Sequence, residues 1–167
     1  AMHDYPRGLA VDSQGYAYVL LRRSSGRYLA KIDPNGNQLW FKKVKGDAYP
    51  VDNSQLEISP VGHLVIVGVE EGHYFIAYYD TAGNLIIYLK KYDRETIFIH
   101  DVTVAANGKI YITGSNACDS GSHCSFLDVY HSNFNPVGSI NFESELTQDL
   151  TVDSSGNIFV TSIKWFD

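Results

Sequence analysis

Short alternating patterns of apolar and polar residues recur along the chain, and each of them is closed by a glycine. In every case an apolar residue, a variable residue and a second apolar residue come just before three turn-forming residues and the glycine. The four segments that share this pattern are Gly8–Gly15, Gln55–Gly62, Asp101–Gly108 and Asp149–Gly156. Their closing glycines lie 46 to 48 residues apart, so the pattern predicts an internal repeat.

Each repeat is predicted to begin with a tight β-hairpin. Residues two apart in a strand point to the same face, so the two apolar positions place their side chains together. The glycine supplies the positive φ that a tight turn needs. A second apolar strand follows the glycine, at Tyr16–Leu21, His63–Val69, Lys109–Thr113 and Asn157–Thr161.

A second turn recurs later in each repeat, between an aromatic-rich strand and another apolar strand. It occupies Asp33–Asn37 in the first repeat and Asp80–Asn84 in the second, while His131–Pro136 has Phe134 in place of the glycine. Asp33–Asn37 lacks the further acidic positions of a calcium loop, so we interpret it as a β-turn. The first repeat is therefore predicted to have four strands, at Leu9–Asp12, Tyr16–Leu21, Arg27–Ile32 and Gln38–Val44.

Four strands in every 46 to 48 residues are typical of β-propeller blades. The unit resembles the bacterial β-propeller repeat (SBBP-like), and more distantly the NHL repeat. The residues that carry this resemblance are Leu9–Val19, Lys31–Trp40, Asp101–Gly114 and Asp149–Thr161; the second repeat departs from the pattern at Pro60 and His63. The resemblance implies one all-β domain over 1–167, a β-propeller of four-stranded antiparallel blades in about 3.5 repeats. The expected repeats are 6–52, 53–98, 99–145 and an incomplete 146–167.

The incomplete fourth repeat leaves the closure of such a ring open. Propellers usually close with 4–8 blades, because an unclosed stack exposes a strand edge at each end. The chain therefore belongs to a longer propeller, closes with itself or with a partner, or forms an open solenoid.

Composition and charge narrow the classes of partner. The formal net charge of −6 argues against a general nucleic-acid binder, which needs a basic face. We interpret the basic cluster in the first repeat as a solvated rim rather than a phosphate site; it contains Arg22, Arg23, Arg27, Lys31, Lys42, Lys43 and Lys45. No apolar stretch reaches the roughly 20 residues of a membrane helix, so membrane insertion is not expected. Ala1-Met2 resembles a cloning remnant, so no targeting signal is inferred from the start of the chain.

Cys118 and Cys124 flank five small or polar residues in an expected hairpin loop. This spacing favours a local disulfide, which would place the protein in an extracellular, periplasmic or cell-surface setting. Two free thiols are an alternative. A metal site made with Asp119 and His123 fits less well, because structural zinc sites use tighter cysteine spacing and a second ligand pair. We therefore expect no metal and no other cofactor.

The resemblance implies that the first strand of each repeat is innermost, so the residues just before it border a central channel. The candidate binding residues at this rim are Arg7, Ser54, Gln55, His100, Asp101, Gln148 and Asp149, with Gly8 at the corresponding place in the first repeat. His100 and Asp101 form the one adjacent pair suited to acid–base chemistry. A structural role is the alternative, because Asp belongs to the repeat pattern here and caps turns or bonds neighbouring backbone.

No catalytic motif of a hydrolase, zinc protease or nucleotide-binding enzyme occurs in the sequence. We therefore expect a non-enzymatic binding or scaffold module that contacts a protein or a glycan. One alternative is an enzyme domain, a lyase or hydrolase, that uses the rim near His100 and Asp101. Another is a structural segment that completes a larger or oligomeric propeller through self-association or further blades. The aromatic stretches around Trp40, Tyr78 and Tyr88 are predicted to pack between blades.

Overall fold

The computed structural model describes residues 5–46, 53–91, 96–117, 123–142 and 145–164, and these residues form an all-β structure without helices. Three sheets have four antiparallel strands and one has two. Sheet I contains β1 (Tyr5–Val11), β2 (Ala17–Arg23), β3 (Gly26–Ile32) and β4 (Gln38–Lys43). Sheet II contains β5 (Gln55–Ile58), β6 (Leu64–Glu70), β7 (His73–Tyr79) and β8 (Leu85–Lys90). Sheet III contains β9 (Thr96–Val104), β10 (Ile110–Ala117), β11 (His123–Tyr130) and β12 (Pro136–Phe142), and sheet IV contains β13 (Glu145–Val152) and β14 (Ile158–Lys164).

The turns between strands have the conformation that the sequence predicts. Asp33 Oδ1 accepts hydrogen bonds from the amides of Asn35 and Asn37, and Gly36 has a φ of 87°. The Asn37 side chain donates to Asp33 Oδ2, and the hydrogen bonds from Asn37 lower the pKa of Asp33. The Asp33 carbonyl oxygen accepts a hydrogen bond from the Gly36 amide, which is the bond that defines a β-turn, so the interpretation of this segment as a β-turn is confirmed. The corresponding turn of sheet II, at Asp80, has the same hydrogen bonds, and so does the β13–β14 turn at Asp153, although that turn belongs to the first hairpin of its sheet.

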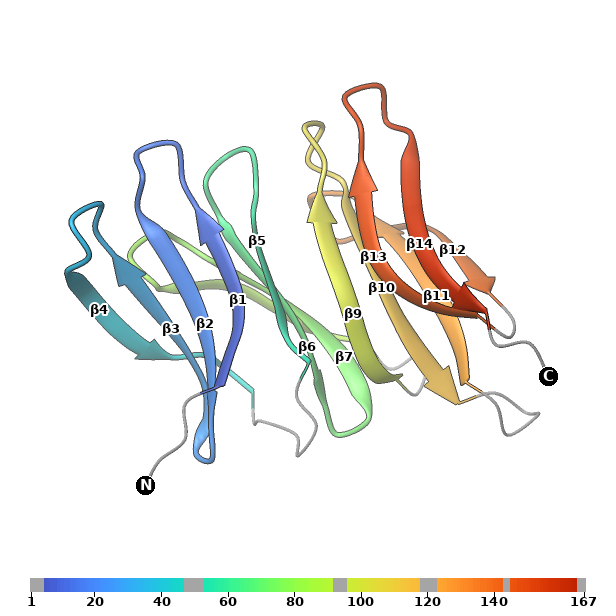
Figure 1. The fold of residues 1–167 in the computed structure, drawn as a ribbon, viewed down its shortest axis with the longest axis horizontal. Coiled ribbons are helices and arrows are strands. Elements are labelled where there is room, and N and C mark those ends of the chain that lie inside the picture. The colour runs from blue at the N-terminus through green and yellow to red at the C-terminus, as the bar shows by residue number, and fades with distance from the viewer. Residues whose placement is uncertain (1–4, 47–52, 92–95, 118–122, 143–144, 165–167) are drawn as a thin grey trace.

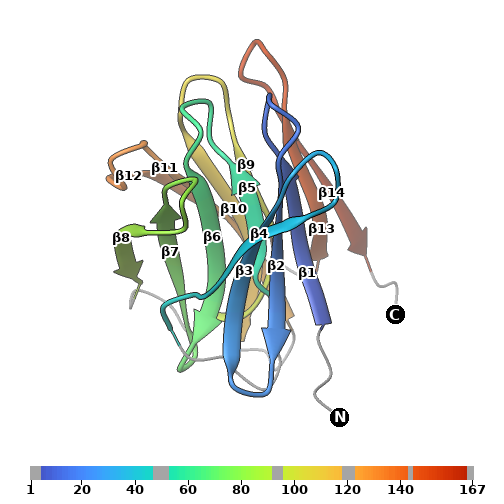
Figure 2. The ribbon, with the colours of Figure 1, turned by 90° about the vertical axis from the view of Figure 1, so that its left-hand side faces the viewer.

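The four sheets stand side by side in chain order, with sheet I and sheet IV at the two ends (Figure 1). The first strands form the continuous line of contact between them: β1 contacts β5, β5 contacts β9 and β9 contacts β13. Figure 2, which looks along the row, shows sheet I in front of the others. Neighbouring sheets therefore contact each other along their first strands, and side chains of the other strands pack in the space between them.

The core lies between neighbouring sheets rather than inside any one of them. Strand β6 contributes to two clusters, because its alternate side chains point to opposite faces. Leu64 and Ile66 pack toward sheet I, whereas Val65 and Val67 pack toward sheet III. This two-sided burial explains why β6 is apolar at nearly every position. The predicted packing of aromatic residues between units is also found, since Trp40, Tyr78 and Tyr88 contact these clusters.

The structure corrects the sequence interpretation of Arg27. This side chain is not part of a solvated rim: it is fully buried between sheets I and II. Its Nε donates to Ser54 Oγ over 2.6 Å, and its Nη2 donates to the carbonyl oxygen of Val69. The guanidinium also lies 4.9 Å from the centre of the Phe75 ring. A buried cation must be hydrogen-bonded, and these groups from sheet II meet that requirement.

The first strand of sheet I also begins earlier than the sequence indicates, at Tyr5 rather than Leu9. Its early part pairs with β2 as Tyr5 with Arg22 and Pro6 with Leu21, and Arg7 is then skipped. The interruption breaks the regular alternation of side chains, so the sequence pattern does not indicate the start of the strand.

Candidate functional site

A polar cavity of about 260 Å³ lies where the first strands of all four sheets come together. Its lining residues are Pro6, Arg7, Asn53, Ser54, Gln55, Ile99, His100 and Gln148. Five of the seven rim residues inferred from the sequence are therefore brought to one place: Arg7, Ser54, Gln55, His100 and Gln148. Asp101 and Asp149 are not among the lining residues.

Three of the lining side chains occupy β-bulges at the same position of their sheets. Arg7 is skipped in the pairing of β1 with β2, His100 in the pairing of β9 with β10, and Gln148 in the pairing of β13 with β14. A bulge changes the direction of the side chain of its extra residue. The bulges therefore turn one polar side chain from each of three sheets toward the shared cavity. The sequence repeat predicted that these residues lie at the rim, but it did not indicate that they occupy bulges.

Arg7 provides the positive charge of the cavity. Its Nε is buried and has no hydrogen-bond partner among the described residues. A buried donor without a partner is costly, and a bound group is one way to satisfy it.

Ser54 and Gln55, by contrast, are engaged within the protein. Ser54 Oγ accepts the hydrogen bond from Arg27, and Gln55 Nε2 donates to the carbonyl oxygen of His100 over 2.8 Å. Through these bonds the two residues connect sheet II to sheets I and III. Both side chains are already hydrogen-bonded within the protein, so neither needs a ligand to satisfy it.

His100 is held by sheet IV. Its Nδ1 lies 3.0 Å from Thr147 Oγ1, and the amide of Thr147 donates to the buried Ser125 Oγ. Burial lowers the pKa of His100, so the ring is neutral near pH 7. A neutral imidazole offers one donor and one acceptor, and it adds no second positive charge beside Arg7.

Asp101 and Asp149 each follow a bulged residue in the first strands of sheets III and IV, and their carboxyl groups share a hydrogen-bond donor. Asp101 Oδ1 accepts from the amide of Val102, and its Oδ2 accepts from the amide of Leu150 in sheet IV. Asp149 Oδ1 accepts from the same Leu150 amide. Burial and the neighbouring Asp149 carboxyl raise the pKa of Asp101 to about 7. These contacts connect sheet III to sheet IV and favour the structural interpretation of the two aspartates.

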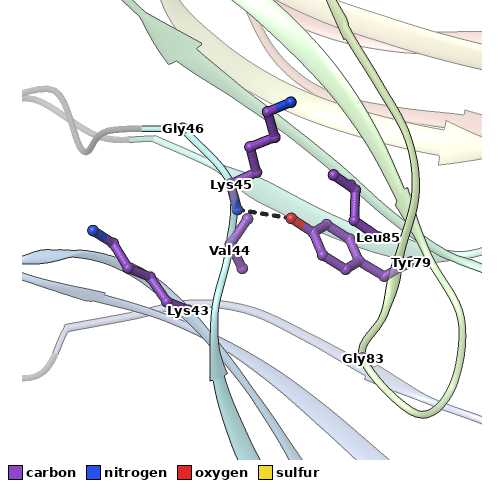
Figure 3. A pocket seen from close by; sticks show the side chains of 7 residues that line it. All are labelled: Lys43, Val44, Lys45, Gly46, Tyr79, Gly83 and Leu85. Atoms are coloured by element: carbon purple, nitrogen blue, oxygen red, sulfur yellow. Dashed lines mark hydrogen bonds between the residues drawn. The ribbon is translucent and has the colours of Figure 1, made fainter.

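A second cavity, of about 380 Å³, lies between the outer strands of sheets I and II (Figure 3). It is lined by Lys43, Val44, Lys45, Gly46, Tyr79, Gly83 and Leu85. The Tyr79 hydroxyl accepts a hydrogen bond from the Lys45 amide, and the side chains of Lys43 and Lys45 point in different directions. The polar groups here do not converge on a common point, which makes this cavity a weaker candidate.

Among the described residues there is no group of three or more His, Cys, Asp or Glu side chains that could hold a metal ion. Cys118 and Asp119 lie outside the described residues, so the pairing of Cys118 with Cys124 stays a prediction. None of the described residues belongs to a helix long and apolar enough to cross a membrane.

Comparisons with known proteins bear on the fold alone. No protein-family model matches the chain, and no curated protein matches it either. The crystal structure of a protein of unknown function from Bacteroides caccae is similar, with a TM-score of 0.55 and 18% sequence identity. The match covers 80% of this chain and 48% of that one, so the chain corresponds to about half of its structural neighbour. At this identity the likeness supports the all-β arrangement of repeated sheets.

Proposed function

We propose that this chain is a non-enzymatic binding module of the β-propeller type, which holds a polar ligand in the cavity between the first strands. The observation that carries the proposal is the set of three bulged residues, Arg7, His100 and Gln148, around one cavity. Ligands of propellers and barrels commonly bind where several repeats converge, because each repeat contributes a side chain there.

The chemistry of the cavity suggests a ligand that carries a carboxylate. Arg7 offers an unpaired guanidinium nitrogen, and guanidinium groups bind carboxylates through paired, charge-assisted hydrogen bonds. The neutral His100 and the exposed Gln148 add donors and acceptors for neighbouring hydroxyl or amide groups. An acidic side chain of a protein and a uronic acid of a glycan share this chemistry.

The geometry gives less support to an enzyme that uses His100 with Asp101. The two side chains follow different paths, since His100 lines the cavity while Asp101 bonds the backbone of Val102 and Leu150. A general base needs to reach both its substrate and its partner, and Asp101 is occupied elsewhere.

Calorimetric titration tests the binding proposal with two probe sets: oligogalacturonates, and short peptides rich in Asp and Glu. One set is expected to bind, and Arg7→Gln should weaken that binding at least tenfold. The matched control is Lys109→Gln, which removes one positive charge from the β9–β10 turn outside the cavity. Equal loss in both variants, or no binding of either probe set to the unaltered protein, would count against the proposal. Turnover of a probe that disappears in His100→Ala would support the enzyme alternative instead.

The extracytoplasmic setting in this proposal depends on the predicted disulfide between Cys118 and Cys124. Intact-mass measurement after alkylation without reductant should show no alkylated cysteine. Two alkylated cysteines in protein purified from an oxidising compartment would remove the support for that setting.

A further inference from the structure

The outer face of sheet I exposes residues whose counterparts in every other sheet are buried. Counting back from the closing glycine, Leu9 of β1 corresponds to Leu56, Val102 and Leu150 in the other first strands. Those three are 7%, 2% and 4% exposed, because each packs against the preceding sheet, whereas Leu9 is 65% exposed. Leu9 therefore occupies a position that packs against a neighbouring sheet elsewhere in the chain, but no described sheet covers it.

The outer face of sheet IV shows the complementary feature. Phe159 of β14 corresponds to Tyr18, Val65 and Tyr111, which face the following sheet and are at most 4% exposed. Phe159 itself is 56% exposed, and Ile163 on the same face of the strand is also exposed. The two ends of the row are thus the two halves of the same kind of interface.

The contact between sheets III and IV shows how such halves fit. Asp101 of sheet III accepts a hydrogen bond from the amide of Leu150, next to the apolar contact that Leu150 makes. Asp149 is the counterpart of Asp101 on the exposed end of sheet IV, and Leu9 is the counterpart of Leu150 on the exposed end of sheet I. If the two ends were placed together, Asp149 could accept a hydrogen bond from the amide of Leu9, as Asp101 accepts one from the amide of Leu150.

Charge favours the same pairing of ends. Several basic side chains of sheet I do not lie on its outer face, since Arg27 is buried against sheet II and Lys42 donates to a carbonyl oxygen of sheet II. On the outer face itself, the Arg23 guanidinium lies against the Tyr28 and Phe41 rings. The exposed end of sheet IV carries the Asp149 carboxyl group. A cation at one end and an acidic side chain at the other favour head-to-tail contact over contact between two equal ends.

We propose that a second copy of this chain occupies these faces, so that sheet IV of each copy packs against sheet I of the other. Two copies joined at both ends place eight sheets in one ring, which lies within the usual range for propellers. The pairing also places a neighbour beside each terminal sheet, which would otherwise leave a broad apolar face in water. This proposal is independent of the ligand in the cavity.

The test is the mass of the protein in solution, measured by light scattering during gel filtration at several concentrations. The unaltered chain is expected to have twice the mass of one chain. Leu9→Asp and Phe159→Asp should each give monomers, because each removes one half of both contacts. Val61→Asp is the control: Val61 is more exposed than Leu9 but lies in the β5–β6 turn, away from both faces, and this variant should remain dimeric.

Mixing the two monomeric variants separates this arrangement from others. The intact sheet IV of Leu9→Asp can meet the intact sheet I of Phe159→Asp, so the mixture should regain a one-to-one complex. That complex is expected to be weaker than the original dimer, because one of its two contacts stays blocked. A monomeric unaltered chain at all concentrations would overturn the proposal and favour completion by further blades. Dimers that persist in Leu9→Asp alone would also overturn it, since they would join equal ends.

Folding of the variants is checked by circular dichroism and thermal melting. Both altered positions are exposed, so the melting temperatures measured below the dimerisation concentration should stay close to that of the unaltered chain. If Leu9→Asp is unfolded, Leu9→Ser replaces it in the same scheme. A folded, dimeric Leu9→Ser chain would then contradict the proposal.

Discussion

Phe134 offers a direct test of how packing between sheets outweighs backbone strain. It occupies the turn position that Gly36 and Gly83 fill in sheets I and II, and it keeps their positive φ, at 67°. An aromatic residue is unfavourable in this conformation. The Phe134 ring is nevertheless buried and meets the Tyr78 ring edge-on at 4.7 Å, across the contact between sheets II and III. Replacing Phe134 with Gly removes the strain and the packing together.

The two effects have opposite signs and different sizes. Relief of the left-handed conformation stabilises the folded state by about 1–2 kcal/mol. Loss of a buried Phe side chain costs about 3–5 kcal/mol, including its contact with Tyr78. Phe134→Gly should therefore lower the free energy of unfolding by about 1–4 kcal/mol. For a chain of this length the middle of that range corresponds to a fall in melting temperature of roughly 5–10 °C.

Urea unfolding followed by circular dichroism measures the change, with Gly36→Phe as the matched control. Gly36 has the same kind of conformation, at a φ of 87°, and open space where its Cβ would be. Gly36→Phe should therefore cost about 1–2 kcal/mol from strain alone, with no gain from packing. If Phe134→Gly were as stable as the unaltered chain or more so, packing across sheets II and III would not justify the strained residue.

Three further changes test the contacts between sheets. Tyr74→Phe removes the hydroxyl that donates to the buried Asp128 carboxylate over 2.7 Å, and should cost about 1.5–3 kcal/mol in urea unfolding; an unchanged midpoint would contradict this. Because the folded state raises the pKa of Asp101, it holds a proton that the unfolded chain releases, so stability should fall as the pH rises from about 4 to 7. Asp101→Asn should flatten that slope, and parallel profiles would refute the assignment. Gly8→Ala places a methyl carbon 2.7 Å from a side-chain carbon of β5 and should cost about 1–3 kcal/mol, whereas Gly138→Ala, with open space around it, should be neutral.

The sequence was sufficient to predict the strands and the turns, because both depend on residues that are close together in the chain. The Asp33 turn illustrates this: its aspartate, glycine and asparagine satisfy one another within five residues. The repeat also indicated which residues would gather at the start of the first strands. Five of these residues line one cavity, although their role in binding stays a prediction.

Features that depend on contacts between sheets were not predictable in the same way. Arg27 lies in a basic stretch, and only its packing against Ser54 and Phe75 from sheet II distinguishes it from exposed neighbours. The bulge at His100 likewise depends on the register with β10, which the alternation of β9 alone does not define. In both cases the deciding partner lies on another strand, and for Arg27 that strand belongs to another sheet.

One position of the repeat shows why variation at the rim is not by itself a sign of binding. The residue that begins each Gly-ended segment contacts the following sheet in a different way each time. Gly8 allows the close approach of β5, Gln55 donates to a carbonyl of β9, and Asp101 accepts from an amide of β13. The variation at this position is explained by packing between sheets. The preceding position differs, because its bulged members, Arg7 foremost among them, turn toward the cavity. The search for a ligand is therefore best directed at the bulges, and the search for what completes the row at the faces that carry Leu9 and Phe159.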